Sequence, residues 1–149
     1  MRTTKGSNGF TLIELLITLV VIGIIAAIAI PNLVSAIDRG KQKRTMADMR
    51  SIGTAVEAYM VDNGKYPVAA DAAELALQIA PSYIRPMPAT DGWNNSYIVT
   101  AETTTYTITS KGKDGVASGC VPGSFTTRLD EDICFSGGQF IQYPQGVQQ

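Results

Sequence analysis

The sequence predicts an α+β protein in which one long N-terminal helix packs against a small antiparallel β-sheet. Three observations predict this class. An apolar run from Phe10 to Ile30 contains a single charged residue, Glu14. Apolar residues then recur at helical spacing as far as residue 62. Short segments rich in Thr, Tyr, Ile and Val, separated by turn residues, follow in the C-terminal half, which is typical of a small sheet.

The composition limits the possible functions. A chain of 149 residues has room for one membrane span and one modest soluble domain. The formal net charge of −1 does not indicate a nucleic-acid partner. The chain contains no histidine, which excludes His-based catalytic triads and most zinc sites. We therefore expect a protein that is not an enzyme.

Residues 10–30 are predicted to form a transmembrane helix. At about 1.5 Å per residue, this stretch matches a hydrocarbon core of about 30 Å, and its many Leu, Ile and Val residues outweigh the cost of one acid. Basic residues flank the span on both sides, so the positive-inside rule does not determine its orientation. The basic cluster that follows the span contains Arg39, Lys41, Lys43, Arg44 and Arg50. Two interpretations of it are open: a solvated helix face, or a contact with a polymer or anionic lipid.

Residues 1–9 are predicted to be a leader, because the polar stretch before Phe10 favours turns over helix. The alternative is a secretory signal peptide cut after Ala29, but the apolar run is long for a signal core and holds Glu14. An acid within a membrane span is costly, so Glu14 is a predicted functional site that needs a partner. The competing interpretation is an acid that snorkels to the nearby interface.

Residues 31–64 are predicted to continue the helix as an amphipathic segment, which ends at Asp62-Asn63-Gly64. Its apolar positions are Leu33, Ile37, Met49, Ile52 and Val56. Gly23 and Pro31 bracket a weak stretch, because proline has no N–H for the carbonyl four residues earlier and glycine costs about 1 kcal/mol in a helix.

Residues 65–149 are predicted to form a globular head. Asp71 caps a short helix that ends before Pro81. Residues 96–100 and 103–109 are predicted to form a β-hairpin, with a third strand at 139–143. Cys120 and Cys134, if bonded, would close a loop of about 14 residues, worth about 3 kcal/mol; reactive or metal-binding thiols are the alternative. Burial of Phe125, Leu129 and Phe135 is expected to anchor this loop.

The segment Gly9-Phe10-Thr11-Leu12-Ile13-Glu14-Leu15-Leu16, followed by the apolar run and Pro31-Asn32, resembles the class III signal and N-terminal helix of type IV pilins and type II secretion pseudopilins. The resemblance implies a type IV pilin-like fold, cleavage between Gly9 and Phe10 by a prepilin peptidase, and N-methylation of Phe10. It also implies a single-pass inner-membrane protein with its head outside the cytoplasm. Such proteins then polymerise through the N-terminal helix, on an inner-membrane assembly platform, into a periplasmic or extracellular filament.

Two assembly hypotheses follow from this resemblance. Glu14 lies four residues after the amine that cleavage would create, and an ammonium and a carboxylate in lipid can neutralise each other. We therefore expect Glu14 to reach the Phe10 amine of a neighbouring subunit. In similar filaments the segment corresponding to Gly23–Pro31 loses helicity, so local melting on assembly is the second expectation.

The segment from Asp91 to Tyr97 is similar to the Asp-Pro-Trp-Gly-Asn-Pro-Tyr segment of the type II secretion major pseudopilin, with departures that include Gly92 and Asn94. A structural turn explains it. The same resemblance implies that a C-terminal loop binds Ca²⁺, which takes six to eight oxygen ligands. The implied ligands are Asp114, Asp130 and Asp132, with Glu131 less certain; solvated turn acids are the alternative.

The sequence therefore predicts a structural filament subunit, with the major pseudopilin of a type II secretion system as the main interpretation. A type IV major pilin for adhesion or motility is the alternative, because a cysteine-bounded C-terminal loop resembles those pilins more. A remote alternative is a membrane-anchored binding domain whose leader is never cut.

Overall fold

The computed structural model describes residues 9–146 and contains two compact units, which divide between Ile37 and Asp38. Each unit is described by itself below. The predicted leader, residues 1–9, lies outside the described residues except for Gly9.

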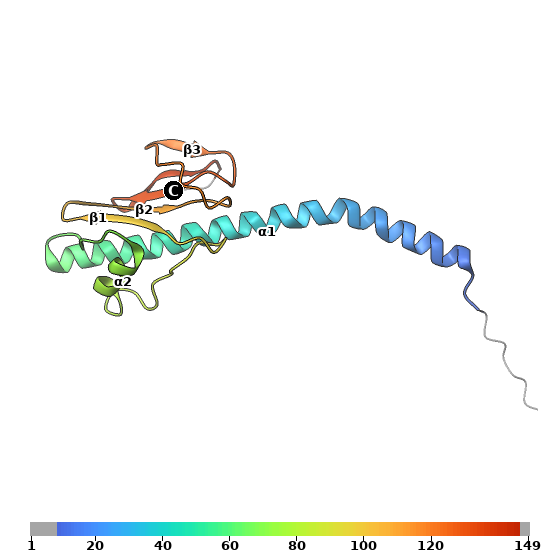
Figure 1. Cartoon of the computed structure of the whole chain (residues 1–149), viewed down its shortest axis with the longest axis horizontal. Coiled ribbons are helices and arrows are strands. Elements are labelled where there is room, and N and C mark those ends of the chain that lie inside the picture. The colour runs from blue at the N-terminus through green and yellow to red at the C-terminus, as the bar shows by residue number, and fades with distance from the viewer. Residues whose placement is uncertain (1–8, 147–149) are drawn as a thin grey trace, which may run out of the picture. The chain divides into compact units, whose positions relative to one another are not determined.

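The first element is α1, a single helix from Leu12 to Asn63 that runs through Pro31 without a break (Figure 1). It ends where Gly64 adopts a left-handed conformation, with φ of 70°, and donates its N–H to the Met60 carbonyl at 2.8 Å. Glycine suits this position because it has no Cβ to clash. The predicted helix is thus confirmed to within two residues at its start. Melting between Gly23 and Pro31 concerns the assembled state and stays a prediction.

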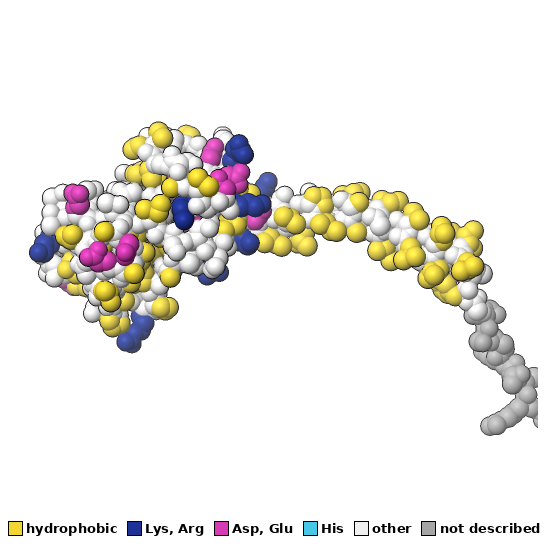
Figure 2. Space-filling model, in the orientation of Figure 1, with side chains coloured by type: hydrophobic (Ala, Val, Ile, Leu, Met, Phe, Trp, Pro, Cys, Tyr) yellow, Lys and Arg dark blue, Asp and Glu magenta, His cyan; other side chains and the backbone are white. Residues whose placement is uncertain are grey.

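The first unit presents apolar side chains to its surroundings. Its most apolar window of 18 residues has a mean hydropathy of 2.9 and none of it is buried, a length and composition sufficient to cross a membrane. Figure 2 shows hydrophobic side chains along this stretch of α1. Leu33 and Ile37, which were expected on the apolar face of the amphipathic segment, are 61% and 50% exposed.

The core of the second unit forms between the later part of α1 and the sheet. Met49, Ile52 and Val56 are fully buried, as their spacing predicts, because positions three and four apart share one helix face. They belong to one cluster with side chains from the strands, among them Val99, Ile108 and Phe135. Asp38 and Thr45 extend the buried face toward the start of this unit.

The sheet has five strands in the order β1-β2-β4-β5-β3. The strands are β1 (Ile98–Glu102), β2 (Thr105–Ser110), β3 (Ser124–Thr126), β4 (Ile133–Ser136) and β5 (Gln139–Pro144). The antiparallel pair β1–β2 is the predicted hairpin, with Val99 opposite Ile108, and β5 is the predicted third strand.

Two features of the sheet differ from the prediction. β3 pairs with β5 in parallel, so the sheet is mixed and not wholly antiparallel. Neither β3 nor β4 was predicted, because β3 has three residues and β4 reads Ile-Cys-Phe-Ser, a run without strict alternation. The available signal was Gly137-Gly138, whose positive φ values of 57° and 78° form the turn between β4 and β5.

The short helix α2 spans Ala72–Ile79, as predicted. The Asp71 carboxylate accepts the Glu74 N–H at 2.8 Å and caps the first turn. Leu75 and Ile79 are fully buried, whereas Leu77 faces outward.

We expect Gly53→Ala to destabilise the second unit by about 2 kcal/mol, because the new methyl group would overlap the Phe135 ring in a close-packed core. Gly40→Ala is the matched control within the same helix. No heavy atom lies within 4 Å of its added Cβ, so this variant should gain up to about 1 kcal/mol from helix propensity. Thermal unfolding of the full chain in detergent measures both. Equal stability of the two variants would contradict the packing.

Candidate functional site

The N-terminal site lies at the first turn of α1. The Thr11 N–H and hydroxyl both donate to Glu14 Oε2, at 2.9 and 2.7 Å, and the Glu14 N–H points back to Thr11 Oγ1 at 3.3 Å. This is a capping box, which satisfies free backbone groups at a helix start. The Thr-x-x-Glu spacing is the sequence signature of a capping box, although the sequence interpretation considered only the charge of Glu14. In the single chain, Glu14 therefore already has a partner.

The predicted cleavage point precedes this helix. Gly9 and Phe10 lie before the first helical residue, Leu12, and both are exposed. An extended, exposed segment is what a peptidase needs at the bond it cuts. Cleavage and methylation at this place stay predictions.

In the second unit, Asp91 organises the turn beside Trp93. Its Oδ1 accepts the N–H groups of Trp93 and Asn95, both at 2.9 Å, and its Oδ2 accepts the Ser110 hydroxyl at 2.8 Å. Asp91 is 3% exposed, so three hydrogen bonds compensate for the burial of its charge. The turn interpretation is thus correct.

The departures at Gly92 and Asn94 have physical reasons. The Gly92 N–H donates to Thr45 Oγ1 at 2.9 Å, a bond that proline could not make, and a Cβ on Gly92 would overlap the Lys41 carbonyl. Asn94 has φ of 73°, a left-handed conformation that asparagine tolerates better than most residues. Gly92 and Asn94 therefore both suit the backbone that this turn adopts.

Asp38 binds the same turn to the loop after β2. Its Oδ1 accepts the Trp93 indole N–H at 3.2 Å, and its Oδ2 lies 2.7 Å from Lys113 Nζ. The Lys113 ammonium, through this hydrogen bond, lowers the pKa of Asp38, and Asp38 in turn raises the pKa of Lys113. The sequence interpretation missed Asp38, which an acid on the buried stripe with Thr45 and Met49 could have revealed.

Asp38→Asn is expected to weaken the acid dependence of stability. A carboxyl whose folded pKa lies below its unfolded value of about 3.9 stabilises the fold above that pH, and the contribution is lost as the pH falls through the folded value. The melting temperature of the wild type should therefore fall further than that of Asp38→Asn between about pH 5 and about pH 3. These two values lie about one unit either side of the unfolded pKa. The exposed Asp62→Asn is the control. Parallel pH curves for wild type and Asp38→Asn would contradict the pairing.

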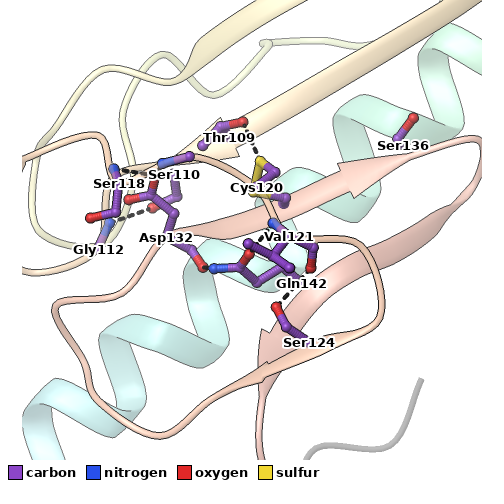
Figure 3. The surroundings of a disulfide bond; sticks show 12 residues. Thr109, Ser110, Gly112, Ser118, Cys120, Val121, Ser124, Asp132, Ser136 and Gln142 are labelled. Atoms are coloured by element: carbon purple, nitrogen blue, oxygen red, sulfur yellow. Dashed lines mark hydrogen bonds between the residues drawn. A yellow bond between two sulfur atoms is a disulfide. The ribbon is translucent and has the colours of Figure 1, made fainter.

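The C-terminal loop between β2 and β4 is closed by a disulfide between Cys120 and Cys134, as expected (Figure 3). Gln142 on β5 holds the same loop, because its amide nitrogen donates to the Asp132 carbonyl at 3.0 Å and its amide oxygen accepts the Val121 N–H at 2.6 Å. Of the expected anchors, Phe135 is 2% exposed and confirmed, whereas Phe125 is 59% exposed and was wrongly expected to be buried.

Asp132 is the most buried of the predicted calcium ligands, with no exposed surface. Its Oδ2 accepts the N–H groups of Ser118 and Gly119 at 2.8 and 2.9 Å (Figure 3). Its Oδ1 is buried and has no hydrogen-bond partner among the described residues. A buried carboxylate oxygen without a donor is an exception in folded proteins, and a bound ion is one explanation.

The other acids point elsewhere. Asp114 is exposed and accepts the Val116 N–H at 2.9 Å; Asp130 pairs with Arg128 at 3.2 Å; Glu131 accepts the Thr127 N–H at 2.7 Å. Within residues 9–146, no three Asp, Glu, His or Cys side chains gather closely enough to hold a metal ion. A site made from three carboxylates is therefore not preformed in this part of the chain.

Backbone carbonyl oxygens offer a second set of possible metal ligands. A Cβ on Gly112, which has φ of 65°, would lie 2.7 Å from the Asp130 carbonyl oxygen and 2.8 Å from that of Glu131. The Asp130 and Glu131 carbonyls therefore pack directly against the Gly112 backbone, and this close approach requires glycine. Ca²⁺ accepts carbonyl as well as carboxylate oxygens, so Asp132 Oδ1 and the carbonyl oxygens of this loop have the right ligand chemistry, although the loop would have to rearrange to bring them around one ion.

Two family models match the chain. The model described as Type II secretion system (T2SS), protein G, matches residues 32–122. The model described as Prokaryotic N-terminal methylation motif matches residues 4–30. Together they cover both the apolar start of α1 and most of the head.

Individual relatives agree with these models. Type II secretion system core protein G of Escherichia coli K12 is 30% identical over 77% of this chain and 88% of the relative. The protein of the same name from Klebsiella michiganensis is 29% identical over 87% of this chain and 92% of the relative. A crystal structure of the major pseudopilin from enterohaemorrhagic Escherichia coli is 24% identical, with a TM-score of 0.47 over 60% of this chain and 85% of that chain.

Proposed function

Because this chain belongs to the type II secretion system protein G family, we propose that it is the major pseudopilin of such a system. In this proposal the chain is a structural subunit and not an enzyme. A prepilin peptidase removes residues 1–9, the new N-terminus at Phe10 is methylated, and the subunits polymerise from the inner membrane with the head outside the cytoplasm. The inner-membrane assembly platform is the expected partner during polymerisation.

The observation that supports polymerisation most directly is the exposure of the first unit. From Phe10 to Ile37 the large apolar side chains of α1 are about half exposed or more, and nothing in the described residues covers them. Lipid can cover such a helix before assembly, and identical helices can cover it afterwards through close van der Waals packing. The same surface then serves the membrane and the filament core.

A type IV major pilin is the second candidate, because the loop closed by Cys120 and Cys134 resembles pilin loops more than the usual pseudopilin loop. The match of residues 32–122 to the protein G family favours the pseudopilin. Deletion of the gene separates the two. A pseudopilin deletion abolishes export of the secreted proteins, whereas a pilin deletion removes surface filaments and leaves export unchanged.

Mass spectrometry of the mature chain tests the first step of the proposal. The expected N-terminus is a methylated Phe10, because a class III signal is cut after its glycine. An intact Met1 would instead support an uncut, membrane-anchored binding domain. A chain that begins after Ala29 would support a secretory signal peptide, and either result contradicts the proposal.

We also propose that the C-terminal loop binds Ca²⁺. After a local rearrangement of the loop, Asp132 Oδ1 and the carbonyl oxygens of Asp130 and Glu131 would hold the ion, and the carboxylates of Asp114 and Asp130 would complete its shell. The bound ion would neutralise the buried Asp132 carboxylate and fasten the loop to β4.

Thermal unfolding of the full chain after chelation tests the calcium proposal. Calcium at about 100 times its dissociation constant should stabilise the folded state by about 2.7 kcal/mol, and Asp132→Asn should remove this calcium-dependent shift. Glu102→Gln, an exposed acid on β1, is the control and should keep the shift. Equal melting temperatures with calcium and with chelator in the wild type would refute the site.

A further inference from the structure

We propose that Arg39 and Lys43 form a binding site for the phosphate headgroup of an anionic phospholipid, at the point where α1 leaves the membrane. The inference goes beyond the subunit role proposed above. It rests only on the membrane-embedded state of the chain and not on filament assembly. The ligand is the singly charged phosphodiester of a lipid headgroup, fixed at a bilayer surface.

The first argument is position along one continuous helix. The apolar stretch ends at Ile37, and residues 38–44 follow it directly in α1. The apolar run 10–37 is longer than the roughly 20 residues that cross about 30 Å of hydrocarbon. When the later end of this run lies at the membrane surface, residues 38–44 cover the next 10 Å or so, at the level of the lipid headgroups. Figure 2 shows Lys and Arg side chains, with Asp and Glu side chains among them, where the apolar stretch ends.

The second argument is the charge left unpaired there. Residues 38–44 contain four cationic side chains and one carboxylate, Asp38. Lys113 neutralises Asp38, and Arg44 pairs with Asp48 at 3.5 Å. Among residues 9–146, no ion pair includes Arg39, Lys41 or Lys43. Residues 38–44 therefore keep a net positive charge that no acidic side chain among residues 9–146 pairs with.

The third argument is geometry. Arg39 and Lys43 are four residues apart, so they lie on the same helix face one turn apart, and both are exposed. Asp38, Thr45 and Met49 occupy the buried face, which keeps the two cations directed away from the head core. Two cations at this spacing can contact one phosphate, with a guanidinium that donates two parallel hydrogen bonds and an ammonium that donates a third.

The chain has a built-in reporter for this site. Trp93 is its one tryptophan, and its indole donates to Asp38, the residue next to Arg39. Trp93 is half-buried, so its fluorescence is sensitive to quenchers close to this end of the head. Bromine atoms on lipid chains quench tryptophan only at short range.

The experiment reconstitutes the full chain in vesicles of fixed composition, phosphatidylcholine with phosphatidylglycerol. In one preparation only the phosphatidylglycerol carries bromine, and in the other an equal amount of the phosphatidylcholine carries it. We expect stronger quenching of Trp93 by brominated phosphatidylglycerol. High salt should reduce the preference, because the site is near the surface and subject to screening.

The double variant Arg39→Gln/Lys43→Gln should lose the preference. Each cation near an anionic surface is worth about fivefold in association, so the lipid selectivity should fall by up to about 25-fold. Lys65→Gln/Arg85→Gln is the matched control, because it removes the same charge from exposed positions, with Lys65 just beyond the other end of α1. This control should quench like the wild type.

The outcomes separate the possible failures. Equal quenching by the two lipids in the wild type would overturn the headgroup site while leaving membrane insertion and the pseudopilin proposal intact. An unchanged preference in Arg39→Gln/Lys43→Gln would also overturn it. No quenching by either lipid would mean that Trp93 and the adjoining cations lie away from the bilayer, and it would also overturn the headgroup site.

Discussion

Glu14→Val is expected to lower filament assembly at least tenfold while membrane insertion stays unchanged or improves. If the Glu14 carboxylate neutralises the Phe10 amine of a neighbouring subunit, its loss leaves an ammonium unpaired in the apolar core. Removing one partner of a buried ion pair costs about 3–5 kcal/mol, and about 1.4 kcal/mol already corresponds to a factor of ten. Insertion does not suffer, because valine prefers the hydrocarbon to glutamate.

The capping box at the start of α1 makes a control necessary, because Glu14→Val also removes the two hydrogen bonds from Thr11. Glu14→Gln can keep those hydrogen bonds but loses the charge, so it should fail to assemble like Glu14→Val. Thr11→Val removes the hydroxyl that takes part in the cap but keeps the charge, so it should assemble. The assembled fraction after crosslinking or shearing, divided by the membrane-inserted fraction, measures each variant.

The opposite pattern would identify a different role. If Glu14→Gln assembles normally and Thr11→Val does not, Glu14 acts through the helix cap and not through a partner subunit. If Glu14→Val assembles at the wild-type rate, neither role limits assembly and the hypothesis of axial register is wrong.

Loss of the disulfide is expected to have the second largest effect. Cys120 and Cys134 are 14 residues apart, and the chain-entropy model gives a loop of this size about 3 kcal/mol. For a domain the size of this head, that corresponds to a fall of about 12–24 °C in melting temperature. The bond closes the loop that contains Asp132 and that Gln142 contacts from β5, so local hydrogen bonds should weaken with its loss.

Two measurements separate the bond from the side chains. Cys120→Ala/Cys134→Ala tests the loss of the cross-link, but it also leaves a small cavity because Cys134 is fully buried. Reduction of the wild-type chain with a thiol removes the bond alone. The two melting temperatures should fall by similar amounts. A fall of only about 2 °C on reduction would mean that hydrogen bonds hold the loop without the cross-link.

The local parts of the fold were predictable because their signals lie within a few neighbouring residues. The apolar run, the Gly64 stop, the Asp71 cap and the β1–β2 hairpin all follow from spacing and residue type. β3 was not predictable in this way, because three residues carry no period and its partner β5 is more than a dozen residues away. The partner of a parallel strand lies beside it in space but far from it in the sequence, so local patterns do not identify it.

The candidate sites divide in the same manner. The turn acid Asp91 and the cysteine pair were recognisable from local pattern and count. The contact of Lys113 with Asp38 joins residues 75 positions apart, and the role of Gln142 depends on the loop that strand pairing brings to it. Phe125 was wrongly expected to be buried, because burial depends on which face of β3 is covered and strand pairing decides this.

The apolar helix, with its one acid, was therefore readable from the amino-acid order alone, because insertion into lipid depends on composition and length and on no other part of the fold. The arrangement of the C-terminal loop could not be predicted in this way. Only tertiary structure brings the buried Asp132 oxygen, the close backbone contact at Gly112 and the disulfide into one place, since each depends on different segments of the chain. Side-chain chemistry names candidate ligands, but packing decides which of them are buried and which remain without a partner.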